Sequence, residues 1–160
     1  MKKQKGFSLI ELLIVVAIIL IIAAIAIPNL LRARIAANES GAVGNLRTMN
    51  TAEVSYITAY PTTGYSLTLT ELGSGGACPV PPTSAKACLI DDTLAAATAA
   101  ATAKAGYFYT YAHTNGQADY NNQGTPASIN SSGVKQFYTD ESGVVRFAAG
   151  AAATATSPAI

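Results

Sequence analysis

The chain begins with a long apolar stretch that differs from everything after it. From Phe7 to Ile27 there are 21 residues and almost all are apolar, which at the helical rise of 1.5 Å gives roughly 31 Å, about the thickness of a bilayer's hydrocarbon core. This pattern predicts a helix that can span a membrane. Its one ionisable residue is Glu11, and such a group costs on the order of 2.5–3.5 kcal/mol at the centre of a span and less near its end. We therefore expect Glu11 to have a function and a partner.

Beyond Pro28 the pattern changes to one apolar side chain every three or four residues, which predicts an amphipathic continuation of the helix over residues 29–60. Pro28 lies inside the pattern, so we expect it to kink the helix and not to end it. Gly41 and Gly44 weaken the middle of this segment by about 1 kcal/mol each relative to alanine. The apolar stripe suits packing on a sheet and consists of Ile35, Ala42, Leu46, Met49, Tyr56 and Tyr60.

The next segment contains proline, glycine and short helical patterns, which predict a connecting region. Thr68 and Glu71 have the spacing of a capping box for one helical turn. Asp92 is the predicted N-cap of a second helix over residues 93–105, and Gly106 is predicted to end it.

Aromatic and β-branched residues then alternate with polar ones between clusters of Asn, Gly and Pro, which predicts an antiparallel sheet. Asp140 to Gly143 is the predicted hairpin turn between its last two strands. The alanine-rich tail after the sheet is of low complexity and is expected to be mobile in an isolated subunit. The predicted strands are residues 107–112, 117–121, 135–140 and 143–147.

Charge and composition restrict the range of functions. At 160 residues and 12% charged residues, the chain allows one modest domain besides the apolar helix. Three lysines precede the apolar run and orient its amino end toward the cytoplasm. Without residues 1–6 the net charge changes from +1 to −2, so we predict no nucleic-acid partner.

The stretch KGFSLIELLIVVAIILIIAAIAIPNLLRAR resembles the type IV prepilin leader and N-terminal helix, which type IV pilins share with type II secretion pseudopilins. The resemblance implies that a prepilin peptidase cuts after Gly6 and that Phe7 becomes an N-methylated terminus. It also implies that Glu11 pairs with the terminal amine of a neighbouring subunit. A buried carboxylate and a buried ammonium are each costly alone, so the pair would fix the axial register. Ser8 stands where many relatives have Thr.

The two cysteines, Cys78 and Cys88, lie in the part of the chain that is expected outside the inner membrane, where a disulfide forms. Closing this loop would stabilise the fold by roughly 3 kcal/mol in the chain-entropy model. Nine intervening residues and the lack of a nearby histidine disfavour a metal or redox site. The stretch from Cys88 to Phe147 is similar to pilin-like globular domains of the shorter, pseudopilin-type build.

Catalysis is not expected. His113 is the sole histidine and is interpreted as a solvated turn residue. The acidic pairs Asp91–Asp92 and Asp140–Glu141 are interpreted as helix caps and turns, because the regular spacing of a calcium loop is missing. No cofactor and no metal site is predicted.

The resulting prediction is an α+β fold of the type IV pilin kind, with a long N-terminal helix packed on a small antiparallel sheet. The predicted function is that of a major pilin in a homo-oligomeric filament for adhesion, motility or surface contact, with a prepilin peptidase, an assembly platform and an ATPase as partners. The precursor would lie in the inner membrane and the filament at the cell surface. The predicted segments are a leader (1–6), a membrane or filament-core helix (7–28), its continuation (29–60), a connecting region with the disulfide (61–106), the sheet (107–148) and the tail (149–160).

Four alternatives remain open from the sequence. They are a type II secretion pseudopilin, whose filament would be periplasmic, a minor pilin with a binding role, an electron-conducting fibre, and a membrane-tethered enzyme that depends on His113. The conducting fibre is disfavoured because Phe7 is the only aromatic residue before Arg47.

Overall fold

The structure is a computed structural model that describes residues 7–160, so the predicted leader with Gly6 lies outside the described residues. The chain forms two compact units, of which the first ends at Arg34 and the second comprises Ile35–Ile160. We refer to them as unit 1 and unit 2 and describe each by itself.

One long helix, α1 (Leu9–Ala59), runs through both units, and its bounds agree with the predicted helix of residues 7–60. Pro28 lies inside α1, so the helix does not end there. Within unit 2 the helix is amphipathic, because an apolar side chain recurs on one face at every third or fourth position. The buried residues of α1 all belong to this part and are Ala42, Leu46, Met49, Asn50, Ala52, Glu53 and Tyr56.

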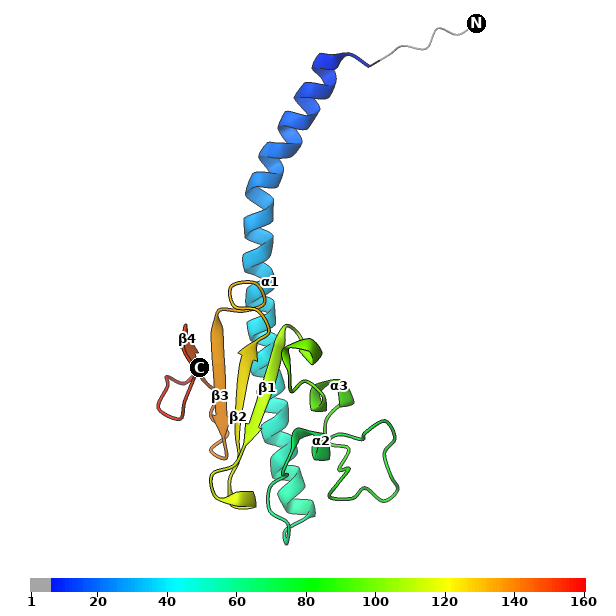
Figure 1. Cartoon of the computed structure of the whole chain (residues 1–160), viewed down its shortest axis with the longest axis vertical. Helices are drawn as coiled ribbons and strands as arrows, with labels where there is room; N and C mark the ends of the chain where they lie inside the picture. The colour runs from blue at the N-terminus through cyan, green and yellow to red at the C-terminus, as the bar shows by residue number, and fades with distance from the viewer. Residues whose placement is uncertain (1–6) are drawn as a thin grey trace, which may run out of the picture. The chain divides into compact units, whose positions relative to one another are not determined.

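Unit 2 also contains a four-stranded antiparallel sheet in the order β1-β2-β3-β4, which lies alongside the cyan part of α1 (Figure 1). The register pairs Tyr109 with Gly124 across β1 and β2, and Phe137 with Phe147 across β3 and β4. The predicted α+β class, with a long helix and a small antiparallel sheet, is confirmed. The strands are β1 (Tyr107–Ala112), β2 (Asn121–Pro126), β3 (Lys135–Asp140) and β4 (Arg146–Ala149).

The core of unit 2 lies between α1 and the sheet. Leu46 and Met49 of the helix belong to one buried cluster with Tyr107, Tyr109 and Phe137 of the strands. The buried tyrosines keep partners for their hydroxyls, since Tyr109 accepts from Asn45 and Tyr107 donates to the carbonyl of Lys135. Burial raises the pKa of Tyr109 to about 12. Because these tyrosine hydroxyls have hydrogen-bond partners, their large aromatic rings can fill the core.

The helix predicted over residues 93–105 is wrong in extent and in its cap. The structure has only α3 (Asp92–Ala95) and a 3₁₀ turn, η1 (Ala100–Thr102). Ala97, between them, is completely buried, and its carbonyl accepts from the backbone N–H of Tyr109. Pairing with the edge of β1 therefore overrides the weak helical preference of an alanine- and threonine-rich stretch.

The predicted end of that helix is also wrong. Gly106 precedes β1 with a φ of 75°, a conformation that favours glycine. A Cβ on Gly106 would lie 2.8 Å from the side-chain nitrogen of Asn38. Gly106 is therefore a point of close approach between the sheet and α1.

The capping box predicted for Thr68 and Glu71 is formed differently. The side chain of Thr68 makes no capping bond to α2 (Leu69–Leu72). Glu71 accepts from the backbone N–H of Leu67, one residue earlier than the motif predicts.

Two strand predictions are shifted. The strand predicted at 117–121 is β2, which begins at Asn121, because a 3₁₀ turn, η2 (Gly116–Ala118), precedes it. Asp119 stabilises this turn by accepting from the backbone N–H groups of Thr114 and Asn115. The last strand, predicted at 143–147, is β4 and begins at Arg146.

The tail packs on the sheet, contrary to the expected mobility. Phe147 donates its N–H to the carbonyl of Pro158, and Ile160 donates to the carbonyl of Val145. Ala153 is completely buried, and its carbonyl accepts from the side chain of Gln123.

Candidate assembly site

The apolar surface of unit 1 is the first feature of a candidate assembly site. Every large apolar side chain from Phe7 to Leu31 is exposed, with fractions between 44% for Leu31 and 81% for Phe7. The helix is long and apolar enough to cross a membrane by length and composition, with a mean hydropathy of 3.3 over its most apolar window and none of that window buried. A helix that is apolar on all sides is stable only when lipid or other helices cover it.

Glu11 lies in the first turn of α1 and has a partner that the sequence reasoning missed. One of its carboxylate oxygens accepts the backbone N–H of Ser8 at 2.9 Å. This is half of a capping box, and the spacing Ser8-x-x-Glu11 is its sequence signal. Glu11 therefore stabilises the start of its own helix. The pairing implied by the resemblance would need a second copy.

The structure says less about the other residues predicted to act in assembly. Phe7 is the first described residue and is exposed. Gly6, on the other side of the expected cleavage point, lies outside the described residues. Pro28 lies within α1, so its backbone nitrogen donates no bond to the helical ladder.

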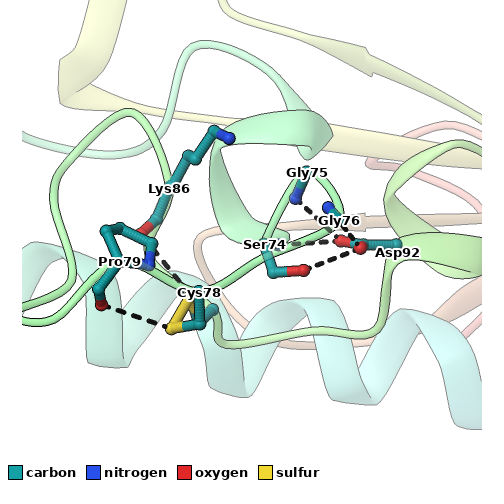
Figure 2. Close-up of a disulfide and its surroundings, with 8 residues drawn as sticks. Ser74, Gly75, Gly76, Cys78, Pro79, Lys86 and Asp92 are labelled. Carbon is teal, nitrogen blue, oxygen red and sulfur yellow. Dashed lines mark hydrogen bonds between the residues drawn. A yellow bond between two sulfur atoms is a disulfide. The ribbon is translucent and has the colours of Figure 1, made fainter.

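Unit 2 contains the predicted disulfide, between Cys78 and Cys88, with a Cα–Cα distance of 5.9 Å. Figure 2 shows that the same region is fixed by Asp92, whose carboxylate accepts the backbone N–H groups of Ser74, Gly75 and Gly76 and the hydroxyl of Ser74. The hydroxyl of Ser74 and these N–H groups lower the pKa of Asp92 to about 2. Asp92 is therefore an anchor for the start of the disulfide loop and not the helix cap that was predicted.

The second acid of this pair, Asp91, has the role predicted for Asp92. It accepts the backbone N–H of Leu94 as the N-cap of α3 and forms an ion pair with Lys104. The hydrogen bond from Lys104 is the main cause that lowers the pKa of Asp91 to about 2. Among residues 7–160, no group of three or more His, Cys, Asp or Glu side chains could hold a metal ion.

A buried carboxylate connects α1 to the sheet. Glu53 is completely buried and accepts the backbone N–H and hydroxyl of Ser66 and the hydroxyl of Tyr111. Desolvation by burial raises the pKa of Glu53, while these hydrogen bonds oppose the rise. Nearby, Tyr120 donates to Asn50 of the same helix. The apolar stripe predicted for this helix omitted this polar layer.

His113 is half-buried, so its predicted role as a solvated turn residue is wrong. Its Nδ1 lies 2.6 Å from the carbonyl oxygen of Asp119, and its ring packs edge-on against Tyr111. Its other nitrogen, Nε2, is buried and has no hydrogen-bond partner within residues 7–160. These contacts hold the loop between β1 and β2 against the end of the sheet.

Comparison with known proteins connects the first of these features to a family. Residues 1–27 match the prokaryotic N-terminal methylation motif. Over 54 residues the chain is 50% identical to the type IV major pilin protein PilA of Myxococcus xanthus, which covers 34% of this chain and 24% of that protein. Over 40 residues it is 65% identical to the type IV wide pilus major component PilA4 of Thermus thermophilus, which covers 25% of this chain and 30% of that protein.

The chain thus spans less than a third of the length of these curated relatives. No solved structure matches it. The resemblance to the type IV prepilin N-terminus, stated from the sequence, is confirmed.

Proposed function

We propose that this chain, whose N-terminus has the type IV prepilin motif, is the major structural subunit of a type IV pilus filament used for adhesion, motility or surface contact. The observation that carries the proposal is the exposed apolar surface of unit 1, with Glu11 as its one acidic residue. Unit 2 has a core of its own, so this apolar surface is available to other molecules.

The same surface suits both stages of assembly. In the precursor, the helix would lie in the inner membrane, where lipid covers its side chains. In the filament, the corresponding helices of other copies would cover them, so the apolar area stays out of water during the transfer. A prepilin peptidase would cleave between Gly6 and Phe7, Phe7 would be N-methylated, and a platform with its ATPase would extract the subunit.

Glu11 would then determine the axial register of the copies. Within residues 7–160, its carboxylate accepts one hydrogen bond, from Ser8. In an apolar fibre core, an unpaired carboxylate is strongly unfavourable, whereas one paired with the terminal amine of Phe7 on a neighbour is tolerated. A copy stacked in the wrong register would leave both charges unpaired.

The decisive variant is Glu11→Gln. Glutamine also occurs at this position of a capping box, so the variant keeps the hydrogen bond from Ser8 and loses only the charge. We expect it to be cleaved and inserted like the wild type and to form about tenfold fewer fibres, counted by electron microscopy of sheared cell-surface material. Glu71→Gln, which also keeps a hydrogen bond to a backbone N–H, is the matched control and should assemble normally.

Normal fibres from Glu11→Gln would show that Glu11 is only a helix cap and would refute the register mechanism. The absence of fibres from the wild-type chain, together with a defect in protein secretion when it is deleted, would instead assign the chain to the type II secretion pseudopilins.

A further inference from the structure

Nearly all acidic side chains among residues 7–160 have a partner within the subunit. All nine acidic residues are described, and every one except Glu141 accepts a hydrogen bond or forms an ion pair. Glu141 is exposed in the turn between β3 and β4. It can therefore pair with a cation of another copy without giving up a bond within its own subunit.

Unit 2 also contains two basic side chains that have no partner in the described part of the subunit. Lys104 and Lys135 form ion pairs, and Arg146 donates to the carbonyl of Ser157. Within residues 35–160, the side chains of Arg47 and Lys86 make neither kind of bond, and both are exposed. Only Arg47 also lines one of the larger grooves of unit 2.

This groove has a volume of about 450 Å³ and lies between α1 and the strands β3 and β4. Val43, Phe137 and Phe147 supply apolar side chains to its lining. Lys135 is already neutralised by Glu39 at 3.4 Å and lies over the ring of Phe147. Among the charged side chains that line the groove, Arg47 is therefore the one without an ion-pair partner, and Ile160 also belongs to the lining.

The turn that carries Glu141 is rigidly built. Asp140 accepts the backbone N–H of Ser142, and the N–H of Gly143 donates to the carbonyl of Asp140. Asn50 of α1 donates to the carbonyl of Gly143, so the helix fixes the turn from the side. Val144, directly after the turn, is an exposed apolar residue. The turn thus presents one free acid and one apolar side chain at little further cost in ordering.

We infer that in the filament the β3–β4 turn of one copy enters this groove of the next copy, with Glu141 paired to Arg47 and Val144 against the apolar lining. The inference rests on the proposed function. The two surfaces differ, so the contact is heterologous, which is the kind of contact that an open helical polymer uses when its rotation does not close a ring. The opposite charges of the two surfaces would determine which partner binds and in which orientation.

Charge reversal tests the contact in a strain that lacks its own pilin. We expect Arg47→Glu and Glu141→Lys each to reduce the number of surface fibres about tenfold, because each places like charges against one another. Lys86→Glu, which reverses an equally exposed cation outside the groove, should leave the fibres unchanged. The amount of membrane-inserted precursor, and its Cys78–Cys88 disulfide on a non-reducing gel, show that the variants fold.

Co-expression of the two single variants then distinguishes a contact between copies from one within a copy. In a mixed filament, the glutamate introduced at position 47 of one copy meets the lysine introduced at position 141 of another, and the native Arg47 meets the native Glu141. We therefore expect the mixture to restore the number of fibres that each variant alone reduces. Co-expressed Arg47→Cys and Glu141→Cys should likewise form a disulfide-linked dimer in sheared fibres.

Three results would overturn the inference. Normal fibres from both reversals would do so and leave the proposed function intact. A defect in Arg47→Glu alone would assign the groove to a different anionic partner. If one chain that carries both Arg47→Glu and Glu141→Lys forms normal fibres, but the two single variants expressed together do not, the ion pair lies within one copy. If the wild-type chain forms no fibres at all, the proposed function itself fails.

Discussion

The two parts of α1 belong to one continuous helix but have opposite surroundings. In unit 1 each large apolar side chain is exposed, whereas in unit 2 Leu46 and Met49 are completely buried against the sheet. Each part contains an acid with its own environment. Glu11 is exposed and accepts one hydrogen bond, and Glu53 is buried and accepts three.

The difference shows how one helix can serve two purposes. A side chain buried in unit 2 contributes to the stability of the subunit, since its apolar area leaves water when the chain folds. A side chain of unit 1 contributes nothing to folding in this sense, because it stays exposed until another molecule covers it. Variants in the two parts should therefore fail at different stages.

Alanine substitutions at one leucine in each part test this most directly. We expect Leu46→Ala to lower the free energy of unfolding of unit 2 by about 3–5 kcal/mol, because it leaves a cavity in the core. Leu20 is 63% exposed, so Leu20→Ala should change that quantity by no more than about 0.5 kcal/mol. Urea denaturation of the full chain in detergent micelles measures both. A destabilisation of unit 2 by Leu20→Ala comparable to that by Leu46→Ala would contradict the separation.

Removal of the disulfide should have the next largest effect and should be confined to unit 2. Replacing both Cys78 and Cys88 by serine is expected to cost about 3 kcal/mol, from the entropy of closing the loop. The same denaturation experiment measures the loss, and hydrogen exchange locates it. Faster exchange at the amides of Ala87 and Leu89, with unchanged exchange in unit 1, is the expected pattern. A variant as stable as the wild type would show that the Asp92 anchor alone holds the loop.

The pH dependence of stability should show the smallest effect and distinguishes the two acids of α1. Burial raises the pKa of Glu53, so the folded state binds a proton more tightly than the unfolded chain does. The contribution of Glu53 to the free energy of unfolding is fully present below its pKa in the unfolded chain, about 4.5. This contribution is lost as the pH rises through the pKa of Glu53 in the folded state. We expect Glu53→Gln to abolish this decline in the free energy of unfolding, measured from about pH 4.5 to about pH 8.

Two controls isolate this effect. Glu11→Gln should leave the decline unchanged, since Glu11 does not belong to the core of unit 2. The polar groups near Glu53 belong to Ser66, Tyr111, Tyr120 and His113. The imidazole is the group among them that can carry a positive charge. The comparison is therefore repeated in a His113→Gln background. A decline that persists in Glu53→Gln would place its origin in another group.

The predictions from the sequence were most accurate where the pattern is strong. The 51-residue helix has the predicted bounds to within two residues because many residues contribute to its signal, and the strands β1 and β3 match their predicted bounds because they are rich in aromatic residues. It failed for residues 93–105 and for β2, where the sequence NNQGTP has little preference for a strand. There the pairing with neighbouring strands, which a single sequence does not show, decides the structure.

The candidate site was predictable to a similar extent. The disulfide follows from the compartment expected for the two cysteines, and the hydrogen bond from Ser8 to Glu11 was present as a capping signal. The assembly roles of Phe7 and Glu11 stay predictions. The buried position of Glu53 was not, because a lone glutamate on a helix is usually solvated. The groove beside Arg47 depends on contacts between α1, β3 and β4 and has no local signal at all.

The way in which the disulfide loop is fixed determines which of its residues can change without affecting the fold. Its ends are fixed by the backbone bonds of Ala87 to Glu71 and of Cys88 to Gly73, while Val80 at its tip is 96% exposed. The exposed residues at the tip, 80–82, can therefore be exchanged or lengthened with little effect on the fold, whereas Ala87 of the same loop is buried in the core. A foreign peptide inserted after Val80 should therefore be accessible to solvent while the scaffold beneath it keeps its fold.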